Sequence, residues 1–563
     1  MIFISILTII VAKALPSLNI KLSPVYFTRI SAIIFIYAGA LSFNTLYIQS
    51  IGSGIGIYSG LFQITQVSQL IEIFLLVIGA LILIAWPLTQ STNKSLQVMN
   101  LYSTDYSLIV LFSTLGSCLL ISCSDLISMY LSIELQSFGL YILSTLYRES
   151  ESSTSAGLKY FLLGGLSSCI ILLGSGVIYA YTGLTNFDSI YSLISISEYN
   201  YIIQGLSLGL ILILVGFLFK IAAAPLHNWS PDVYDDTPTI VTIWLTIMPK
   251  IAIIILLLEL HTQIGIIGGA TPSVVNMMIT SSGYAEVLNT IQYHSLTNLS
   301  SITSQSLLDI LGNTSMNIIN NLLLISSLLS LIIGTVVGLA QTRIKRLLAY
   351  STISHIGFIL LALAINTEQS IDSLLFYIIQ YSITNLNIFL IIIALGYIIN
   401  NSLGPNKDKT MKDIKYISEF KGKYFFNPLL SLSLAVCLFS MAGIPPLMGF
   451  FSKQFVLYSA VQNGYNFISI VAILVSVVSA SYYLKIIKVL HTYPENEDTN
   501  SLVENNSNSF LTKGEVDVME NTKLTNFHSY LISSLTLSIL LFILKPTLIL
   551  NSTQLLSLSL FNL

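Results

Sequence analysis

The stretch GFLFKIAAAPLHNWSPDVYDDTP, from Gly216 to Pro238, begins as an apolar membrane helix and then interrupts it. Lys220 lies on the helix, Pro225 breaks it, His227 follows the break, and three aspartates end the stretch. Proline removes a backbone N–H and clashes with the preceding turn, so the break frees carbonyl groups and admits water. A lysine beside such a break at membrane depth indicates a hydrated site that holds an ionisable group.

The composition is that of a polytopic membrane protein. Of 563 residues, 54% are hydrophobic and only 9% are charged, whereas soluble proteins carry roughly 25% charged residues. The formal net charge of −3 gives no basic surface suited to nucleic acid. The four cysteines lie in apolar segments without Cys-x-x-Cys spacing, so the sequence indicates no zinc, iron–sulfur or other metal site.

Fourteen segments are apolar enough to be transmembrane helices, because a span needs about 20 mainly apolar residues. They lie near residues 1–20, 26–48, 67–89, 106–122, 123–147, 157–182, 202–226, 238–260, 320–341, 346–366, 370–400, 428–460, 466–490 and 529–549. Loops that follow odd-numbered spans contain Lys and Arg, whereas loops that follow even-numbered spans contain none, which supports this count. Residues 261–319 are predicted as an outer-side insertion, residues 491–527 as a solvated inner loop, and GSGIGIYSG, residues 52–60, as a plain loop.

The broken segment occurs twice. FKIAAAPLH, residues 219–227, aligns with FSMAGIPPL, residues 439–447, and Pro225 matches Pro445 at an offset of 220 residues. The two copies are five spans apart, and because five is odd they would be inverted relative to each other in the membrane. The pattern predicts an all-α protein with two inverted five-helix repeats, in which spans seven and twelve are discontinuous.

Several charged residues lie where loop placement does not explain them. Lys250 is near the middle of span eight, where an ammonium costs about 2.5–3.5 kcal/mol on insertion scales. Lys453 follows the second break, and Glu134 lies eleven residues after Cys123, deep in its own span. A carboxylate at that depth needs a counterion. Lys220 fits its depth best, so we expect a Glu134–Lys220 pair.

Buried lysines and acids of this kind can handle protons. A buried lysine alternates between its charged and neutral forms when an ionic partner approaches or withdraws. Two helical histidines could extend the polar route, although a lone buried histidine is often only a hydrogen-bonded core residue. Three aspartates after the first break are expected in a solvated loop. The predicted proton-handling residues are Glu134, Lys220, Lys250, Lys453, His227 and His355.

Four motifs resemble those of one family, the proton-conducting antiporter-like subunits of respiratory complex I, the NADH:ubiquinone oxidoreductase. The motifs are LKYFLLGGLSSCIILLG (158–174), FKIAAAPLHNWSPDVYDDTPTIV (219–241), KRLLAYSTISHIGF (345–358) and GIPPLMGFFSKQFVL (443–457). They extend from span six to span twelve. The resemblance implies a membrane subunit that translocates protons while electrons pass from NADH to ubiquinone in other subunits.

The resemblance also implies how the chain is divided. Residues 1–105 would be an N-terminal three-helix segment, and residues 106–260 would be the first repeat, spans four to eight. Residues 261–319 would be the insertion, and residues 320–490 the second repeat, spans nine to thirteen. Residues 491–563 would contain the inner loop and the final span.

The same resemblance assigns residues to the site. Glu134 matches the family's glutamate of span five, Lys220 the lysine of broken span seven, and Lys250 the central lysine of span eight. His227 matches the histidine after the first break. Lys453 matches a span-twelve site that is lysine in one sister subunit and glutamate in another.

The family context implies the remaining components. NADH, FMN, the iron–sulfur clusters and ubiquinone would belong to other subunits, with no cofactor or metal in this chain. The implied partners are antiporter-like sister subunits, small membrane subunits and lipids such as cardiolipin. The bias toward Ile, Leu, Ser, Asn, Tyr and Phe is typical of an AT-rich coding genome, such as a fungal mitochondrial one, so we expect the mitochondrial inner membrane. Two alternatives remain: a subunit of a multi-subunit cation/proton antiporter, and a purely structural membrane scaffold.

Overall fold

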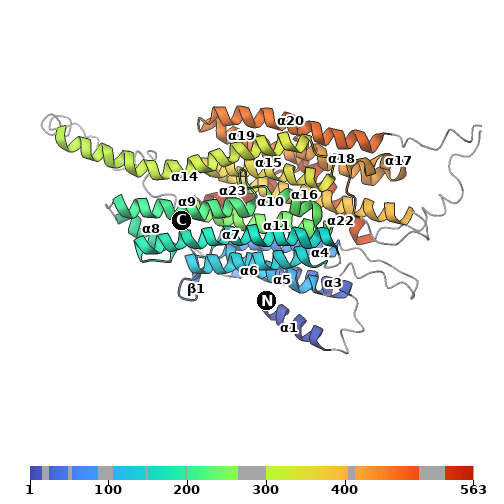
Figure 1. Ribbon diagram of the computed structural model, residues 1–563, viewed down its shortest axis with the longest axis horizontal. Helices are drawn as coiled ribbons and strands as arrows, with labels where there is room; N and C mark the ends of the chain where they lie inside the picture. Colours follow the sequence, from blue (N-terminus) through green and yellow to red (C-terminus); the bar gives the residue numbers. More distant parts are fainter. Residues whose placement is uncertain are drawn as a thin grey trace, which may run out of the picture.

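The protein is a bundle of long helices. The computed structural model describes residues 1–15, 24–48, 54–85, 105–147, 150–196, 200–263, 299–402, 413–492 and 526–561. Most of these residues are helical, and the long helices lie side by side along one common direction (Figure 1). The N-terminal helices form one edge of the bundle and α20 lies at the opposite edge (Figure 1). The prediction of an all-α polytopic membrane protein is confirmed.

The N-terminal segment contains the helices α1 (Ile2–Ala14), α3 (Pro24–Ile48) and α4 (Gln66–Ile84). The prediction that residues 52–60 form a loop without regular structure is wrong in part. The connection between α3 and α4 contains an antiparallel hairpin of β1 (Ile55–Ile57) and β2 (Phe62–Ile64). Gly60 has a φ of 85° in the turn, a conformation that glycine adopts without steric cost.

The segment predicted as the first repeat contains α5 (Tyr106–Ile121), α6 (Leu126–Thr145), α7 (Glu151–Thr182), α8 (Phe187–Ile196), α9 (Asn200–Ile221), α10 (Trp229–Asp236) and α11 (Thr239–Gln263). Local sequence explains several helix ends. Asp125 caps α6 by accepting a hydrogen bond of 2.8 Å from the N–H of Ile127. Gly183 ends α7 with a φ of 70°. The aspartates expected in a solvated loop lie in the short helix α10 instead, because basic residues of a later helix pair with them.

The later part contains α14 (Leu299–Leu339), α15 (Ile344–Ile365), α16 (Glu368–Ser402), η1 (Ile417–Phe420), α17 (Lys423–Phe426), α18 (Pro428–Ala442), α19 (Met448–Gln462), α20 (Asn466–His491), α22 (Asn526–Leu540), η2 (Leu541–Leu544) and α23 (Thr547–Phe561). One predicted boundary is wrong. The final span predicted at 529–549 divides at Pro546, which lacks the N–H that helix continuation needs. α14 begins at Leu299 and so extends into the predicted insertion, while its candidate membrane span, Ile319–Leu339, agrees with the span predicted near 320–341. The rest of the insertion, 264–298, and the inner loop over 493–525 lie outside the described residues.

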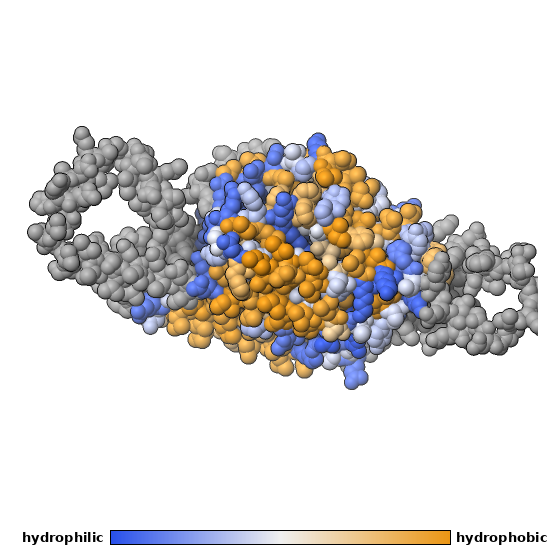
Figure 2. All heavy atoms as spheres, turned by 90° about the horizontal axis from the view of Figure 1, so that it is seen from above, coloured by the Kyte–Doolittle hydropathy of each residue, from blue (hydrophilic) through white to orange (hydrophobic). Residues whose placement is uncertain are grey.

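The surface shows a membrane-like distribution of side chains. Figure 2 shows hydrophobic residues gathered across the middle of one face, with hydrophilic residues nearer both ends of the long axis. In the described ranges, 11 helices are long and apolar enough to cross a membrane, and α1, α5 and α18 are shorter apolar helices. Each of the fourteen predicted segments contains one of these helices. The number of spans itself stays a prediction.

Two membrane helices are broken where the recurring motif predicts breaks. α9 runs for 22 residues to Ile221, and Ala222 then adopts a φ of 64° before the chain enters α10. α18 runs for only 15 residues and ends at Gly443, whose φ is 86°. Since a helix rises about 1.5 Å per residue, α18 is about 10 Å shorter than α9.

Glycines allow α7 and α9 to pack closely. A Cβ atom added at Gly174 would lie 2.7 Å from the carbonyl oxygen of Gly209, and one at Gly209 would lie 2.5 Å from Cγ1 of Ile178. Both distances are too short for real atoms, so neither position accepts a side chain unless the helices separate. Small residues at membrane helix interfaces permit this approach, and the contact places the helix that carries Lys220 against α7.

The variant Gly174→Val should therefore push α7 and α9 apart and reduce accumulation of the folded chain, because overpacking costs about 1–3 kcal/mol or more. Gly176→Val is the matched control, since a Cβ added at Gly176 meets nothing within 4 Å. Native gel electrophoresis of the membrane complex measures accumulation. Equal amounts of both variants would contradict the close packing.

Candidate functional site

Glu134 on α6 and Lys220 on α9 form a buried ion pair. The Nζ atom of Lys220 lies 3.7 Å from Oε1 of Glu134, and the two side chains are 7% and 15% exposed. Lys220 also donates a hydrogen bond of 3.4 Å to Oγ of Ser168 on α7. The contact expected from depth alone is present. Because 3.7 Å exceeds hydrogen-bond length, the two charges attract each other while neither is fixed to the other.

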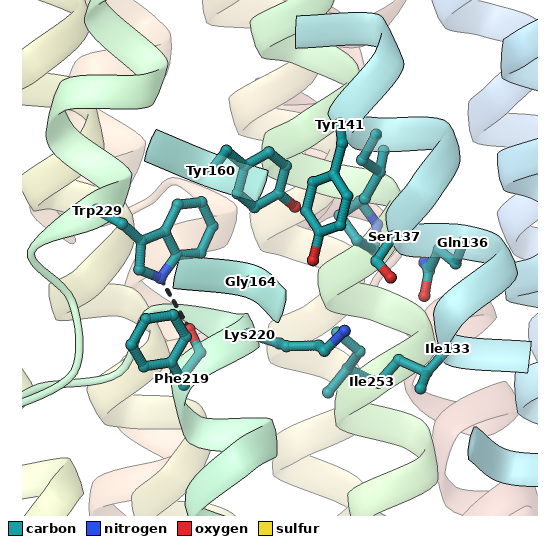
Figure 3. Close-up of a pocket in the computed structure, with 12 residues that line it drawn as sticks. Ile133, Gln136, Ser137, Tyr141, Tyr160, Gly164, Phe219, Lys220, Trp229 and Ile253 are labelled. Atoms are coloured by element: carbon teal, nitrogen blue, oxygen red, sulfur yellow. Dashed lines mark hydrogen bonds between the residues drawn. The ribbon is translucent and has the colours of Figure 1, made fainter. Parts of the chain in front are cut away.

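A small cavity adjoins the Lys220 amine. Its polar lining includes Gln136, Ser137 and Tyr141 of α6 and Tyr160 of α7. Figure 3 shows the Lys220 side chain extended toward α6, where Ser137 and Gln136 lie. The lysine thus has an ionic partner, a hydroxyl partner and adjacent space lined by polar groups.

Trp229 supports the backbone at the first break. Its Nε1–H donates a hydrogen bond of 2.9 Å to the carbonyl oxygen of Phe219, the residue before Lys220 (dashed in Figure 3). Its ring stacks on Tyr160 with centroids 4.7 Å apart. The last carbonyls of a helix lack helical partners. The first residue of α10 therefore supplies a donor that the interrupted α9 needs.

Lys250 joins the two halves of the molecule. It lies on α11 directly after Pro249, is 2% exposed and donates a hydrogen bond of 3.2 Å to Oγ1 of Thr352 on α15. Its Nζ atom also lies 5.4 Å from the ring centre of Tyr234 on α10, where the ring face attracts a cation. The amine is thus held by a hydroxyl of the second half and a ring of the first.

Lys453 occupies the second break. Its Nζ atom donates hydrogen bonds to the carbonyl oxygens of Met441 at 2.8 Å and Ala442 at 3.0 Å, the last two residues of α18. The carbonyl end of a helix carries partial negative charge, which stabilises a cation. In the described ranges, neither Lys250 nor Lys453 forms an ion pair with a carboxylate.

His355 on α15 lies between these two lysines. Nδ1 is 2.7 Å from the hydroxyl of Tyr377 on α16, and Nε2 is 3.4 Å from the hydroxyl of Tyr483 on α20. Thr352, one turn before His355, accepts the hydrogen bond from Lys250. Phe358, three residues after His355, has its ring centre 5.7 Å from Nζ of Lys453. Residues three apart share a helix face, so this face of α15 connects the surroundings of both lysines.

His227 is separate from this group. It is 8% exposed, and its ring centre lies 6.3 Å from that of Tyr350. Its Nδ1 atom has no hydrogen-bond partner among the described residues. Within the same residues, no hydrogen bond or ion pair links His227 to Glu134 or to the lysines.

The polar residues of α16 are functional-site residues that were not predicted from the sequence. They are Tyr377, Gln380, Tyr381, Thr384 and Asn385, and each is at most 4% exposed. Their spacing of three and four residues forms a polar stripe on a membrane helix, which was a usable signal. Tyr381 donates a hydrogen bond of 3.2 Å to the carbonyl oxygen of Thr246, one turn before Lys250. The stripe thus reaches the same interior region as the lysines.

Comparison with known proteins places this arrangement in a family. A family profile described as NADH:quinone oxidoreductase/Mrp antiporter, TM, matches residues 123–304 and 295–479. The chain belongs to this family of membrane proteins. It is 48% identical to "NADH-ubiquinone oxidoreductase chain 2" of Rhizopus oryzae over 100% of both chains. It is 31% identical to "NADH-quinone oxidoreductase subunit N" of Pelagibacter ubique over 82% of each chain.

Solved structures share the fold. A chain of respiratory complex I from Thermus thermophilus superposes with a TM-score of 0.63 at 24% identity, covering 98% of this chain and 99% of that one. A chain of the Mrp complex from Dietzia superposes with a TM-score of 0.71 at 18% identity, covering 100% of this chain and 96% of that one. Both likenesses concern the arrangement of helices alone.

The variant Trp229→Phe should loosen the first break, because phenylalanine retains an aromatic ring for stacking but cannot donate to the Phe219 carbonyl. A lost hydrogen bond costs about 0.5–1.5 kcal/mol, so amide exchange in residues 219–229 should accelerate several-fold. Hydrogen–deuterium exchange with mass spectrometry measures it. Trp244→Phe is the control, since that indole donates to Ser113 Oγ at 3.0 Å, away from the break. Unchanged exchange in Trp229→Phe would refute the supporting role.

Proposed function

We propose that this chain is a core membrane subunit of mitochondrial respiratory complex I that translocates protons across the inner membrane. Electrons pass from NADH to ubiquinone in other subunits. The observation that carries the proposal is the set of buried ionisable side chains: Lys220, Lys250 and Lys453 are each enclosed in a helical bundle, and each finds polar partners there. The near relative from Rhizopus oryzae, matched over its full length, supports the mitochondrial assignment.

Glu134 acts as the movable counterion in this proposal. An ammonium in a low-dielectric site holds its proton more tightly when a carboxylate is near and less tightly when the carboxylate withdraws. The gap of 3.7 Å to Lys220 is short enough for attraction and long enough for exchange of partners. Movement of Glu134 would therefore load or release a proton at Lys220, beside the polar cavity.

Lys250, His355 and Lys453 continue the route into the second half. Thr352 contacts Lys250, and the imidazole of His355 lies between two tyrosine hydroxyls. A neutral imidazole has one nitrogen that donates and one that accepts, so it can take a proton on one side and release it on the other. The carbonyl groups at the end of α18 then stabilise the charged form of Lys453.

The finer assignments follow from the same proposal. Residues 106–260 and 320–490 act as the two inverted repeats, and His227 lies directly after the first break. The partners are sister antiporter-like subunits, small membrane subunits and lipids such as cardiolipin. FMN, iron–sulfur clusters and the nucleotide and quinone sites belong to other subunits. Among the described residues, no group of three or more His, Cys, Asp or Glu side chains gathers to hold a metal.

The alternative function, a cation/proton antiporter subunit, has weaker support than the complex I function. The Mrp chain shares the fold at 18% identity, and a fold alone does not determine function. Purification separates the alternatives, because a complex I subunit should co-purify with NADH oxidation activity. A chain that exchanges cations without NADH or quinone would support the antiporter.

Lys250→Met should lower proton translocation roughly tenfold or more, because a positioned proton carrier contributes at least that much to transfer. Proton uptake by vesicles containing the assembled complex, divided by NADH oxidised, measures the effect. Lys545→Met is the control, since this exposed lysine lies between η2 and α23. A normal proton-to-electron ratio in Lys250→Met would reject the proposed function.

Tyr377→Phe should slow proton translocation several-fold while the complex still assembles, because it removes the hydroxyl 2.7 Å from His355 and little volume. The same vesicle assay measures the rate. Tyr458→Phe makes the identical chemical change on α19 at a residue that is 59% exposed. If both variants pump at the wild-type rate, the His355 hydroxyl route is wrong.

A further inference from the structure

α15 begins with an unusual concentration of basic residues: Arg343 is its N-cap, and Lys345 and Arg346 lie in its first turn. The N-terminus of a helix carries partial positive charge, so cations there are unfavourable unless carboxylates compensate them. The carboxylates come from elsewhere in the chain. They are Asp232 and Asp235 of α10 and Asp413, which precedes η1.

Lys345 and Asp413 together hold the connection between α10 and α11. Nζ of Lys345 lies 2.7 Å from Oδ2 of Asp413 and donates a hydrogen bond of 2.9 Å to the carbonyl oxygen of Thr237, and this lysine is 3% exposed. The same Oδ2 atom accepts a hydrogen bond of 2.8 Å from the N–H of Thr239, the first residue of α11. One lysine and one aspartate thus fix the end of one helix and the start of the next.

Arg343 and Asp235 form the second contact. Nη1 of Arg343 lies 2.7 Å from Oδ2 of Asp235, whose side chain is only 6% exposed. The segment around Asp413 is itself attached to α15, because the N–H of Ile344 donates to the carbonyl oxygen of Lys415 and the N–H of Ile417 donates to that of Thr342, both at 3.0 Å. The start of α15 and the segment around Asp413, which are bonded to each other, therefore together hold the end of α10.

Two parts of the proposed proton route extend from the held segment. α10 begins at Trp229, which donates to the Phe219 carbonyl and lines the Lys220 cavity. α11 continues from Thr239 to Lys250. α10 and α15 pack side by side in the middle of the bundle (Figure 1). A displacement of residues 235–239 would therefore move the wall of the cavity and the helix that carries Lys250.

We infer that Arg343–Asp235 and Lys345–Asp413, with the hydrogen bonds to Thr237 and Thr239, form an ionic clamp that positions Trp229 and Lys250 for proton transfer. The inference rests on the proposed function. Arg343, Lys345, Asp235 and Asp413 are positioning residues, because in the structure they act through α10 and α11. The clamp links the two halves of the chain at the connection between α10 and α11.

The charges support a permanent clamp. Burial raises the pKa of the Asp413 carboxyl, but the charge and hydrogen bond of Lys345 and the N–H of Thr239 more than offset this, so the pKa lies below its usual value. Asp413 therefore stays ionised at neutral pH. Asp232 also pairs with Arg346 at 3.1 Å and Lys159 at 3.2 Å, but these groups are 35%, 38% and 51% exposed. Pairs in which both members are this exposed are screened and weak, so the ionic clamp excludes them. Each clamp pair has one buried member, Asp235 at 6% or Lys345 at 3% exposed, although its partner, Arg343 at 43% or Asp413 at 38%, is partly exposed.

A different explanation for the basic residues is membrane topology, since Lys and Arg favour the inner side of a membrane. The acidic partners separate the two explanations. Asp235→Asn and Asp413→Asn remove clamp contacts and retain every basic residue. If topology were the whole role of Arg343 and Lys345, these variants would pump normally.

The test uses the assembled complex in vesicles. Asp235→Asn should lower the proton-to-electron ratio at least threefold and accelerate amide exchange in residues 222–239. Arg343→Gln should do the same, and the double variant should be no worse than either single variant, because non-additivity is expected for two residues that act as a pair. Arg343→Lys should retain most of the ratio. Lys159→Gln, which breaks only an exposed pair with the same helix, is the matched control and should pump normally.

The outcomes separate the ionic clamp from the proposed function. Normal pumping and normal exchange in both Asp235→Asn and Asp413→Asn, with pumping lost in Lys250→Met, would overturn the clamp alone. Normal pumping in Lys250→Met would overturn the proposed function. If Asp235→Asn fails to accumulate, Asp235→Glu retains the charge and should accumulate and pump. Failure of Asp235→Glu as well would show that a carboxylate at this position is not sufficient to hold α10 and would overturn the clamp.

Discussion

The structure depends on how a membrane protein holds ammonium groups away from bulk water. An isolated lysine at the centre of a membrane helix costs about 2.5–3.5 kcal/mol on insertion scales, so each buried lysine must meet oxygen atoms or aromatic faces. Lys220 meets Glu134 and Ser168, and Lys250 meets Thr352. Lys453 meets the carbonyl groups at the end of α18. Helices that are distant in sequence must therefore pack together to provide these partners.

The two helix breaks meet this need in different ways. The second break supplies carbonyl oxygens directly to Lys453. At the first break the carbonyl oxygen of Phe219 accepts a hydrogen bond from Trp229. The partner of Lys220 is instead a carboxylate from another helix, that of Glu134 on α6. A recurring sequence motif thus produces two sites with different electrostatics. Under the proposed function, this difference would let the two breaks perform separate steps of one proton route.

The site residues that could be predicted from the sequence are those of a type that is rare inside apolar spans. A glutamate or lysine inside an apolar span is conspicuous, and depth alone paired Glu134 with Lys220. The sequence did not predict the hydroxyls around His355, because the chain contains 30 tyrosines and none is conspicuous by its type alone. Only the regular spacing of Tyr377, Tyr381 and their neighbours on α16 indicated a polar face. His227, although conspicuous in sequence, lies apart from that group.

The sequence by itself determined the membrane class, the helical segments and the two breaks, because apolar length, lysine placement and proline act locally along the chain. It could not determine that the aspartates after the first break form α10, or that α14 starts at Leu299. Nor could it show which helices face each other across the two halves. Those features were decided by tertiary structure, because α15 brings Arg343 and Lys345 to Asp235 and Asp413 from far along the chain. Pairing of buried charges depends on three-dimensional distance, which no local pattern records.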